Sequence, residues 1–161
     1  VKLAKKERIK LINADKFKSE RDIMIVTFDL DVFKNKDSNL LDLLKEQDDN
    51  LIFGLANPDF ELYLLLHIEN SLNTTIIPNK ARILENEKEG KQRPCQRLLK
   101  QLTGLNPKKN EDIGKLAENV NIAISQEKHI NQNSQYFLTE LSSNIGTIIE
   151  KMKEEKSPFQ Y

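Results

Sequence analysis

Residues 23–31 read Ile-Met-Ile-Val-Thr-Phe-Asp-Leu-Asp, an apolar and β-branched run that ends in two aspartates. A short apolar run without polar alternation is typical of a parallel strand that is covered on both faces. Residues 51–55 form a second such run, and residues 42–47 between the two, with leucines from Leu40 onward, indicate a short helix. The pattern predicts a β-α-β unit, and therefore an α/β fold with a partial parallel sheet flanked by helices.

The neighbouring segments extend this unit. Residues 3–12 predict a basic helix. Asn57 is placed to cap a helix that begins with Pro58 and continues to about Glu69, because proline suits the first helical position. Two parallel strands are too few for a stable domain, so we expect further strands from sequence ahead of Val1 or from a partner chain. A first residue other than methionine is consistent with N-terminal truncation.

Beyond residue 70 the sequence predicts loops and helices without a further strand. Residues 70–92 are polar and irregular, which indicates a loop. Residues 94–102 predict a short helix with Arg97 and Lys100 exposed, and residues 103–107, Thr-Gly-Leu-Asn-Pro, predict its end and a turn.

Two apolar stripes at helical spacing, in residues 112–128 and 137–152, predict amphipathic helices that cover the sheet. The C-terminal half is thus expected to be helical. We expect a single domain over residues 1–161 with three parts: an α/β core in residues 1–69, a basic loop and short helix in residues 70–110, and C-terminal helices in residues 111–156.

The composition is that of an ordinary soluble domain. The chain has 161 residues, of which 38% are hydrophobic and 31% charged. Its longest apolar run, residues 62–66, is far shorter than the roughly 18 residues of a membrane span, and the N-terminus lacks the apolar region of a signal peptide. Cys95 is the single cysteine, which excludes an intramolecular disulfide and a cysteine metal cage. We expect a cytoplasmic protein without a membrane interaction.

Charge is segregated along the chain although its formal net charge is zero. Residues 1–21 contain eight basic and three acidic residues, whereas residues 37–61 contain seven acidic residues and Lys45. Residues 80–109 contain nine basic and three acidic residues. Such segregation can place a basic rim around an acidic centre, as an enzyme that acts on a polyanion needs. The simpler alternative is a set of solvated helix faces.

The acidic residues predict a divalent-metal site. Asp29 and Asp31 are two residues apart, so their side chains point the same way if the strand continues through Leu30. Oxygen ligands at that spacing suit Mg²⁺ or Mn²⁺, and the carboxyl ends of parallel strands form the usual ligand crevice. Asp59 and Glu61 begin the helix after the neighbouring strand, at the same edge. Such a centre would belong to a phosphodiester-cleaving or phosphoryl-transfer module.

Each of these residues also has a structural interpretation. Aspartates after a strand commonly cap turns, and Asp59 is a favourable charge in the first turn of a helix. His67 is expected to be packed, and His129 to be solvated. Glu61 is followed by apolar residues, so its burial would require a cation, a hydrogen-bond donor or a helix N-terminus.

Two motifs carry a resemblance to a known family. The first is Phe28-Asp29-Leu30-Asp31-Val32-Phe33, and the second is Ala56-Asn57-Pro58-Asp59-Phe60-Glu61-Leu62-Tyr63-Leu64-Leu65-Leu66-His67-Ile68. They resemble the FDxDxF and NPxFELWLLLHF signatures of the RloB-like family of prokaryotic proteins, and weaker similarity continues to Met152. The chain departs from these signatures at three positions: Tyr63 stands where tryptophan is usual, Asp59 where a small residue or cysteine is usual, and Ile68 where phenylalanine is usual. We interpret these departures as mild changes in packing.

The resemblance implies a TOPRIM-like domain associated with restriction-modification loci and phage defence, often encoded beside an ATPase. In such folds an Asp-x-Asp holds Mg²⁺, which Asp29 and Asp31 match. A glutamate at the end of an earlier strand acts in acid/base chemistry, and no stretch of residues 1–20 reads as that strand.

The favoured hypothesis is a metal-dependent nuclease-like component of an antiviral defence system. Asp29 and Asp31 would bind Mg²⁺ or Mn²⁺, Glu61 would act as the catalytic or orienting carboxylate, and DNA is the expected nucleic acid. The phosphate contacts are assigned to a basic group comprising Lys91, Arg93, Arg97 and Lys100. The alternative is a non-catalytic nucleic-acid-binding or scaffold subunit that docks on a defence ATPase, with a homo-oligomer as a further option. A nucleotide-binding domain is disfavoured, because the chain has five glycines and lacks a glycine-rich phosphate loop.

Overall fold

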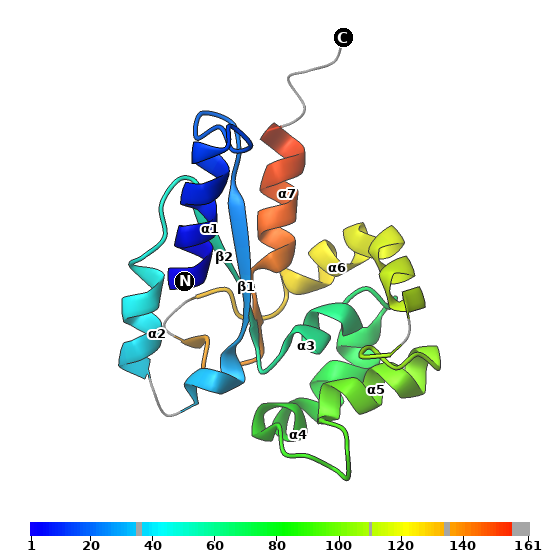
Figure 1. Cartoon of the computed structure of the whole chain (residues 1–161). Helices are drawn as coiled ribbons and strands as arrows, with labels where there is room; N and C mark the ends of the chain where they lie inside the picture. The colour runs from blue at the N-terminus through cyan, green and yellow to red at the C-terminus, as the bar shows by residue number, and fades with distance from the viewer. Residues whose placement is uncertain (35–36, 110, 134–135, 156–161) are drawn as a thin grey trace.

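The computed structural model describes residues 1–34, 37–109, 111–133 and 136–155, and within them it is a mixed α/β protein. Strands β1 (Met24–Asp29) and β2 (Leu51–Asn57) pair in parallel, with Met24 opposite Leu51 and Asp29 opposite Ala56. Strand β3 (Ser142–Ser143) pairs antiparallel with the end of β2. The described sheet has the order β1-β2-β3, with helices around it (Figure 1). The predicted α/β class and parallel pair are confirmed.

Strand β1 is less buried than predicted. Its side chains alternate between half-buried and exposed, and Ile25 is 37% exposed. The reason is its position at the edge of the described sheet, where it has β2 as its neighbour on one side. Strand β2 lies between two strands and is almost entirely buried, as the unbroken apolar run predicts.

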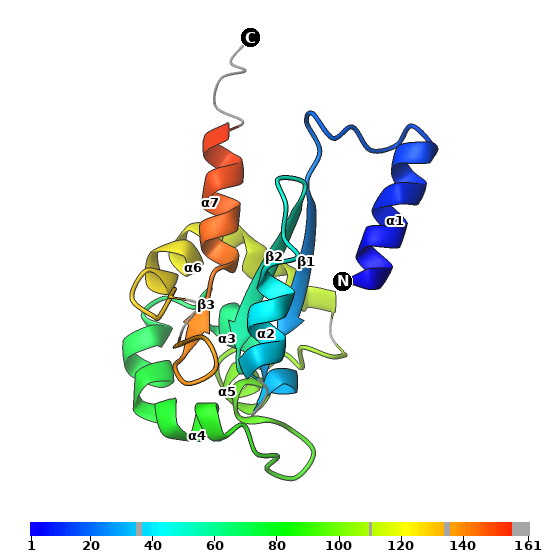
Figure 2. The same ribbon diagram turned by 90° about the vertical axis from the view of Figure 1, so that its left-hand side faces the viewer.

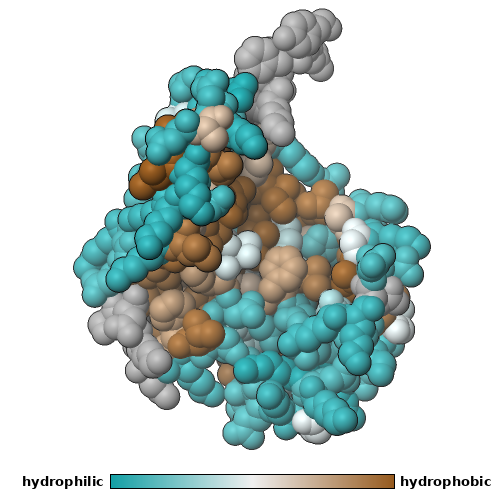
Figure 3. All heavy atoms as spheres, in the orientation of Figure 1, coloured by the Kyte–Doolittle hydropathy of each residue, from teal (hydrophilic) through white to brown (hydrophobic). Residues whose placement is uncertain are grey.

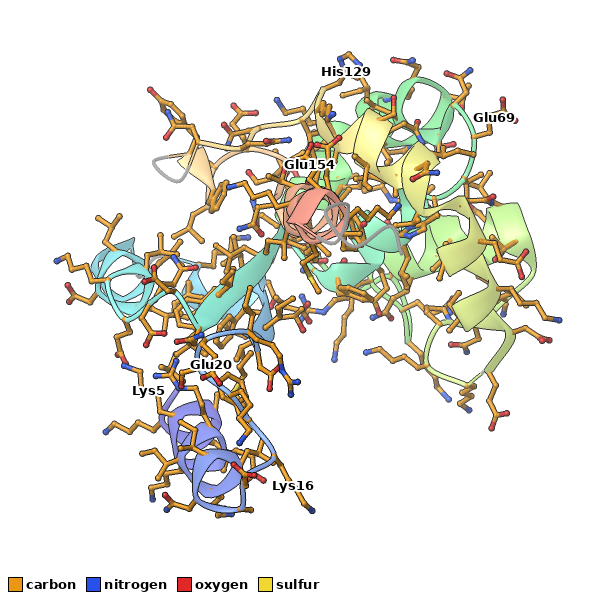
Figure 4. All side chains as sticks on the ribbon, turned by 90° about the horizontal axis from the view of Figure 1, so that it is seen from above. Lys5, Lys16, Glu20, Glu69, His129 and Glu154 are labelled. Atoms are coloured by element: carbon orange, nitrogen blue, oxygen red, sulfur yellow. The ribbon has the colours of Figure 1, made fainter. Side chains whose placement is uncertain are left out.

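Helix α1 (Lys2–Asn13) confirms the predicted basic helix, but it buries no side chain. It projects from the rest of the molecule, as Figure 2 shows, and Figure 4 places Lys5, Lys16 and Glu20 on this side, far from Glu69 and His129. Two exposed ion pairs, Lys5 with Glu46 and Arg8 with Asp48, connect α1 to the loop before β2. Exposed pairs of this kind contribute little stability.

Helices α2 (Asp37–Leu44) and α3 (Phe60–Leu65) flank β2 in sequence. The prediction that Asn57 caps α3 is wrong, because Asn57 is the last residue of β2. It pairs with Ser142 of β3, and its side-chain amide donates to the carbonyl of Glu140 at 2.8 Å. Helix α3 therefore starts later than Pro58 and ends before Glu69.

The predicted loop at residues 70–92 is largely helical. It contains a π-helix (Leu72–Ile76), a 3-10 helix (Ile77–Asn79) and α4 (Lys80–Glu85). Leu72, Ile76 and Ile83 are buried in the same apolar cluster, which anchors this segment to the core. The prediction failed because many polar residues surround these three. Helix α5 (Pro94–Thr103) follows as predicted, and Gly104 ends it with a φ of 73°.

The two predicted C-terminal helices are shorter than expected. A 3-10 helix (Glu111–Asn119) precedes α6 (Val120–Glu127), and α7 begins only at Ile145 and ends at Glu155. The expectation of no strand after residue 70 is wrong, because β3 lies just before α7. Asn144 explains the break: its side chain accepts from the Leu55 amide at 2.7 Å and donates to the Phe53 carbonyl at 3.0 Å, and so extends the pairing of β2.

Two apolar clusters lie on the two sides of β2. Leu51, Phe53 and Leu55 pack with Leu30 and Leu40 on one side. On the other side, α7 packs directly on the strand, since a Cβ at Gly54 would lie 3.4 Å from Ile145. Helix α7 thus covers the sheet as predicted, whereas α6 packs against α7 and α3. Among the described residues, none of the helices has the length and apolar character needed to cross a membrane.

A buried carboxylate joins α6 to α7. Glu127, the last residue of α6, is fully buried. Its oxygens accept hydrogen bonds from the Ser143 hydroxyl at 2.6 Å and from the amides of Gly146 and Thr147 at 2.8 Å. Glu127 therefore satisfies free backbone amides at the start of α7, and its negative charge interacts favourably with the positive end of the helix dipole.

This packing predicts that Gly146→Ala destabilises the protein by about 1–3 kcal/mol. A Cβ at this position would lie 3.0 Å from the Glu127 carboxylate and 3.2 Å from the backbone of Ile124, and neither can move without breaking the cap. Gly114→Ala is the matched control, because a Cβ there meets nothing within 4 Å. Urea unfolding of both variants is the measurement, and equal free energies of unfolding would contradict the prediction.

Candidate functional site

The carboxyl ends of β1 and β2 bring four acidic residues into one region. Strand β1 ends at Asp29, and β2 leads through a cis Asn57-Pro58 bond to Asp59 and Glu61 at the start of α3. The amide of Asp31 donates to the carbonyl of Pro58 at 3.0 Å, which ties the segment after β1 to the segment after β2. The four residues, Asp29, Asp31, Asp59 and Glu61, are called the carboxylate cluster below.

Asp29 caps α3. Its Oδ1 accepts a hydrogen bond from the backbone amide of Phe60, the first residue of that helix, at 2.8 Å. This is the role that the sequence assigned to Asn57. No local signal could have revealed it, because the two partners are 31 residues apart.

Asp31 does not continue the strand. The two aspartates were expected to point the same way only if the strand continued through Leu30. Residues Leu30–Phe33 form a 3-10 helix instead, so this condition is not met. The chain turns there because Leu30 is fully buried in the apolar cluster beside β2. The Asp31 carboxylate instead forms an ion pair with Arg93 at 2.5 Å and accepts a hydrogen bond from the side-chain amide of Asn86 at 3.4 Å.

Asp59 is the most unusual member of the cluster. It is 2% exposed, and neither of its carboxylate oxygens has a hydrogen-bond partner of ordinary geometry among the described residues. Burial, and then the negative charges of Glu61 and Asp29, raise the pKa of Asp59 to about 7. The thiol of Cys95 opposes this rise, but a thiol is a weak donor. Sequence reasoning treated Asp59 as a simple helix-end charge and missed its burial.

The first turn of α5 lines the other side of the cluster. Glu61 is buried, and the side-chain amide of Gln96 donates to its Oε1 at 3.0 Å. Cys95 is fully buried, and burial together with Asp59 raises the pKa of its thiol well above the ordinary value. The predicted burial of Glu61 and its need for a donor are both confirmed. Cys95 and Gln96 were not expected to contribute.

The predicted phosphate-binding residues fall into two groups. Arg93 pairs with Asp31, and Arg97 pairs with Glu89 at 2.6 Å. Lys91 and Lys100 are exposed, and neither takes part in an ion pair within the described residues. The two arginines are thus engaged by carboxylates, while the two lysines are available to an anion.

The two histidines lie outside the cluster. His67 is buried with its ring 4.8 Å from that of Tyr63, and its Nδ1 lies 3.0 Å from the Tyr63 carbonyl. Burial lowers the pKa of His67. His129 is exposed. Both observations agree with the structural roles expected from the sequence.

The donor set fits a hard divalent cation in its chemistry. Carboxylate oxygens are the ligands that Mg²⁺ and Mn²⁺ prefer, and two buried oxygens lack a partner. Among the described residues, no group of three or more His, Cys, Asp or Glu side chains is already arranged to hold a metal ion. Binding would therefore require rotation of these side chains toward one another.

The fold and the cluster define an α/β protein with an acidic centre at the carboxyl ends of two parallel strands. A family model for RloB-like proteins matches residues 1–152, so the chain belongs to the RloB-like family. No curated protein and no solved structure matched the sequence in the corresponding searches.

The raised pKa of Asp59 predicts a pH-dependent loss of stability. A group whose pKa is higher in the folded protein stabilises it below the ordinary pKa of 3.8, and this contribution is lost as pH rises through about 7. Between pH 5 and pH 8, we expect the free energy of unfolding to fall by roughly 2–3 kcal/mol more in the native protein than in Asp59→Asn. Urea unfolding across this range measures the difference.

Asp49→Asn is the control for this experiment, since Asp49 is an exposed acidic residue outside the cluster. Its stability should follow that of the native protein at each pH. If the free energy of unfolding changes with pH in the same way in the native protein and in Asp59→Asn, the raised pKa of Asp59 is refuted.

Proposed function

We propose that this protein is a Mg²⁺- or Mn²⁺-dependent nuclease-like component of a prokaryotic anti-phage defence system, with DNA as its substrate. The observation that carries the proposal is the carboxylate cluster at the carboxyl ends of β1 and β2, with two buried oxygens that lack a partner. Membership of the RloB-like family supports it, because the family resemblance implies a TOPRIM-like domain in restriction-modification and defence loci.

In this proposal, Asp29 and Asp31 hold the divalent ion and Glu61 orients the site. A bound divalent ion would supply Lewis-acid stabilisation of the charge that develops on the phosphate. The chain holds these groups in place through α5: Gln96 fixes the Glu61 carboxylate at 3.0 Å, and Arg93 neutralises Asp31 at 2.5 Å. Substrate would therefore approach the cluster from its solvent side, where Arg93 and Asp31 are partly exposed.

Lys91 and Lys100 are the proposed phosphate contacts. They flank Arg93 and Gln96, which touch the cluster, and both lysines are exposed. A basic surface beside an acidic centre would hold a polyanion near the reacting phosphate. Arg97 would contribute if it exchanged Glu89 for a phosphate.

The test of catalysis is Mg²⁺-dependent nicking of DNA by the full-length protein and by Asp29→Ala and Asp29→Asn. The asparagine variant keeps an oxygen that can accept from the Phe60 amide, so it separates the loss of charge from the loss of the helix cap. We expect both variants to lose about 100-fold or more in rate, as removal of several kcal/mol of metal-assisted stabilisation implies.

Asp49→Asn should nick at the native rate. Equal nicking by the native protein and both Asp29 variants would overturn the assignment of Asp29 to the reaction.

The basic surface is tested by DNA affinity as a function of salt. In Lys91→Ala/Lys100→Ala, the slope of log affinity against log salt should fall by about 2, because each phosphate contact contributes about 0.9. Lys151→Ala/Lys153→Ala is a matched control on α7, where Lys151 lines a pocket with Ile23 and Ile52 near the opposite ends of the strands. Equal slopes in the two double variants would contradict the assigned surface.

A specific observation also favours the alternative, a non-catalytic subunit that docks on a defence ATPase. An apolar groove of about 390 Å³ is open on the exposed side of β1 and is lined by Ile25, Tyr63, Ile113, Val120 and Ile148. Figure 3 shows the apolar side chains gathered on this face. Surfaces of this kind commonly bind a partner. Co-purification with an ATPase from the neighbouring gene, together with no metal binding by calorimetry, would support this alternative over the nuclease.

A further inference from the structure

Asp59 has no structural role that accounts for its burial. It precedes α3, but its side chain makes no capping hydrogen bond, and Asp29 caps that helix instead. A buried carboxylate without a partner costs free energy, and buried charges in proteins are normally paired or bound to a metal. The residue therefore needs a partner that the described chain does not supply.

The neighbouring donors are already engaged. Arg93 is paired with Asp31, and the side-chain amide of Gln96 is bonded to Glu61. The thiol of Cys95 acts on Asp59 directly, but it is a weak donor. The other nearby groups, Glu61, Asp29 and Asp31, carry the same sign of charge as Asp59.

A proton on Asp59 would not fully resolve this arrangement. It would remove the charge, but the resulting hydroxyl would still require an acceptor, and neither oxygen of Asp59 has a partner of ordinary geometry among the described residues. A divalent cation would compensate Asp59 and its acidic neighbours together. A further unpartnered oxygen, Oδ1 of Asn86, belongs to the residue whose amide donates to Asp31.

We propose that Asp59 is a direct ligand of a divalent cation, bound at the inner end of the carboxylate cluster with Asp29 and Glu61 as its neighbours. The proposal rests on the proposed function in that it adds a ligand to the same site, but it depends on metal binding and not on cleavage. Oxygen donors identify the class of ligand as a small hard cation, Mn²⁺ or Mg²⁺.

The ion pair between Arg93 and Asp31 compensates one of the four acidic side chains of the cluster. The guanidinium supplies one positive charge on the outer side, 2.5 Å from Asp31, and leaves Asp59 uncompensated. A cation beside Asp59 would supply the charge that Arg93 does not, and Asp29 and Glu61 would rotate toward it.

The experiment is Mn²⁺ titration of the full-length protein by isothermal calorimetry at pH 7.5, with the native protein, Asp59→Asn, Asp29→Asn and Asp49→Asn. Asp59→Asn has nearly the same shape as the native residue and removes a buried charge, so it should fold at least as stably. A thermal melt without metal checks this. We expect Asp59→Asn to weaken Mn²⁺ binding by about 10- to 100-fold and to lose the rise in melting temperature with Mn²⁺.

The outcomes separate this inference from the proposed function. Affinity that is lost in Asp29→Asn but unchanged in Asp59→Asn would overturn the inference and leave the metal-dependent site of the proposed function in place. Loss of affinity in Asp59→Asn, with Asp49→Asn like the native protein, supports the inference even if no nicking is detected. A native protein that binds neither Mn²⁺ nor Mg²⁺ would overturn both.

Discussion

The side chain of Asp59 is buried among three other acidic groups, and among the described residues neither of its oxygens has a hydrogen-bond partner of ordinary geometry. This uncompensated charge is the constraint around which the candidate site is arranged. Strand β2 ends two residues before it, the amide of Asp31 is bonded to the intervening Pro58, and the first turn of α5 closes the opposite side. Acidic side chains this close together require nearby positive charge, and Arg93 provides part of it by pairing with Asp31.

The surrounding fold supplies two kinds of surface to this centre. Two exposed lysines, Lys91 before α5 and Lys100 within it, are close in sequence to Arg93 and Gln96, which contact the cluster. The exposed face of β1, in contrast, opens into an apolar groove. The first surface suits a polyanion and the second suits an apolar partner. The two functions considered above therefore use different parts of the same small sheet, and they are compatible with one protein in a larger assembly.

The sequence predicted the parts of the fold that depend on continuous local patterns. The apolar runs of β1 and β2, and the helix from Pro94, were found because each has a strong local signal. Strand β3 was missed because two serines carry no strand pattern, and their pairing depends on Asn144 bonding to β2 about 90 residues away. The burial of Asp59 and the pairing of Arg93 with Asp31 likewise arise from contacts between distant segments.

The most direct test of the central claim is a crystal of the full-length protein soaked in Mn²⁺ and measured by anomalous diffraction. The account predicts an anomalous peak within bonding distance of an Asp59 oxygen, about 2 Å, with Asp29 or Glu61 as a second ligand. Anomalous peaks confined to exposed carboxylates, with none at the carboxylate cluster, would contradict it.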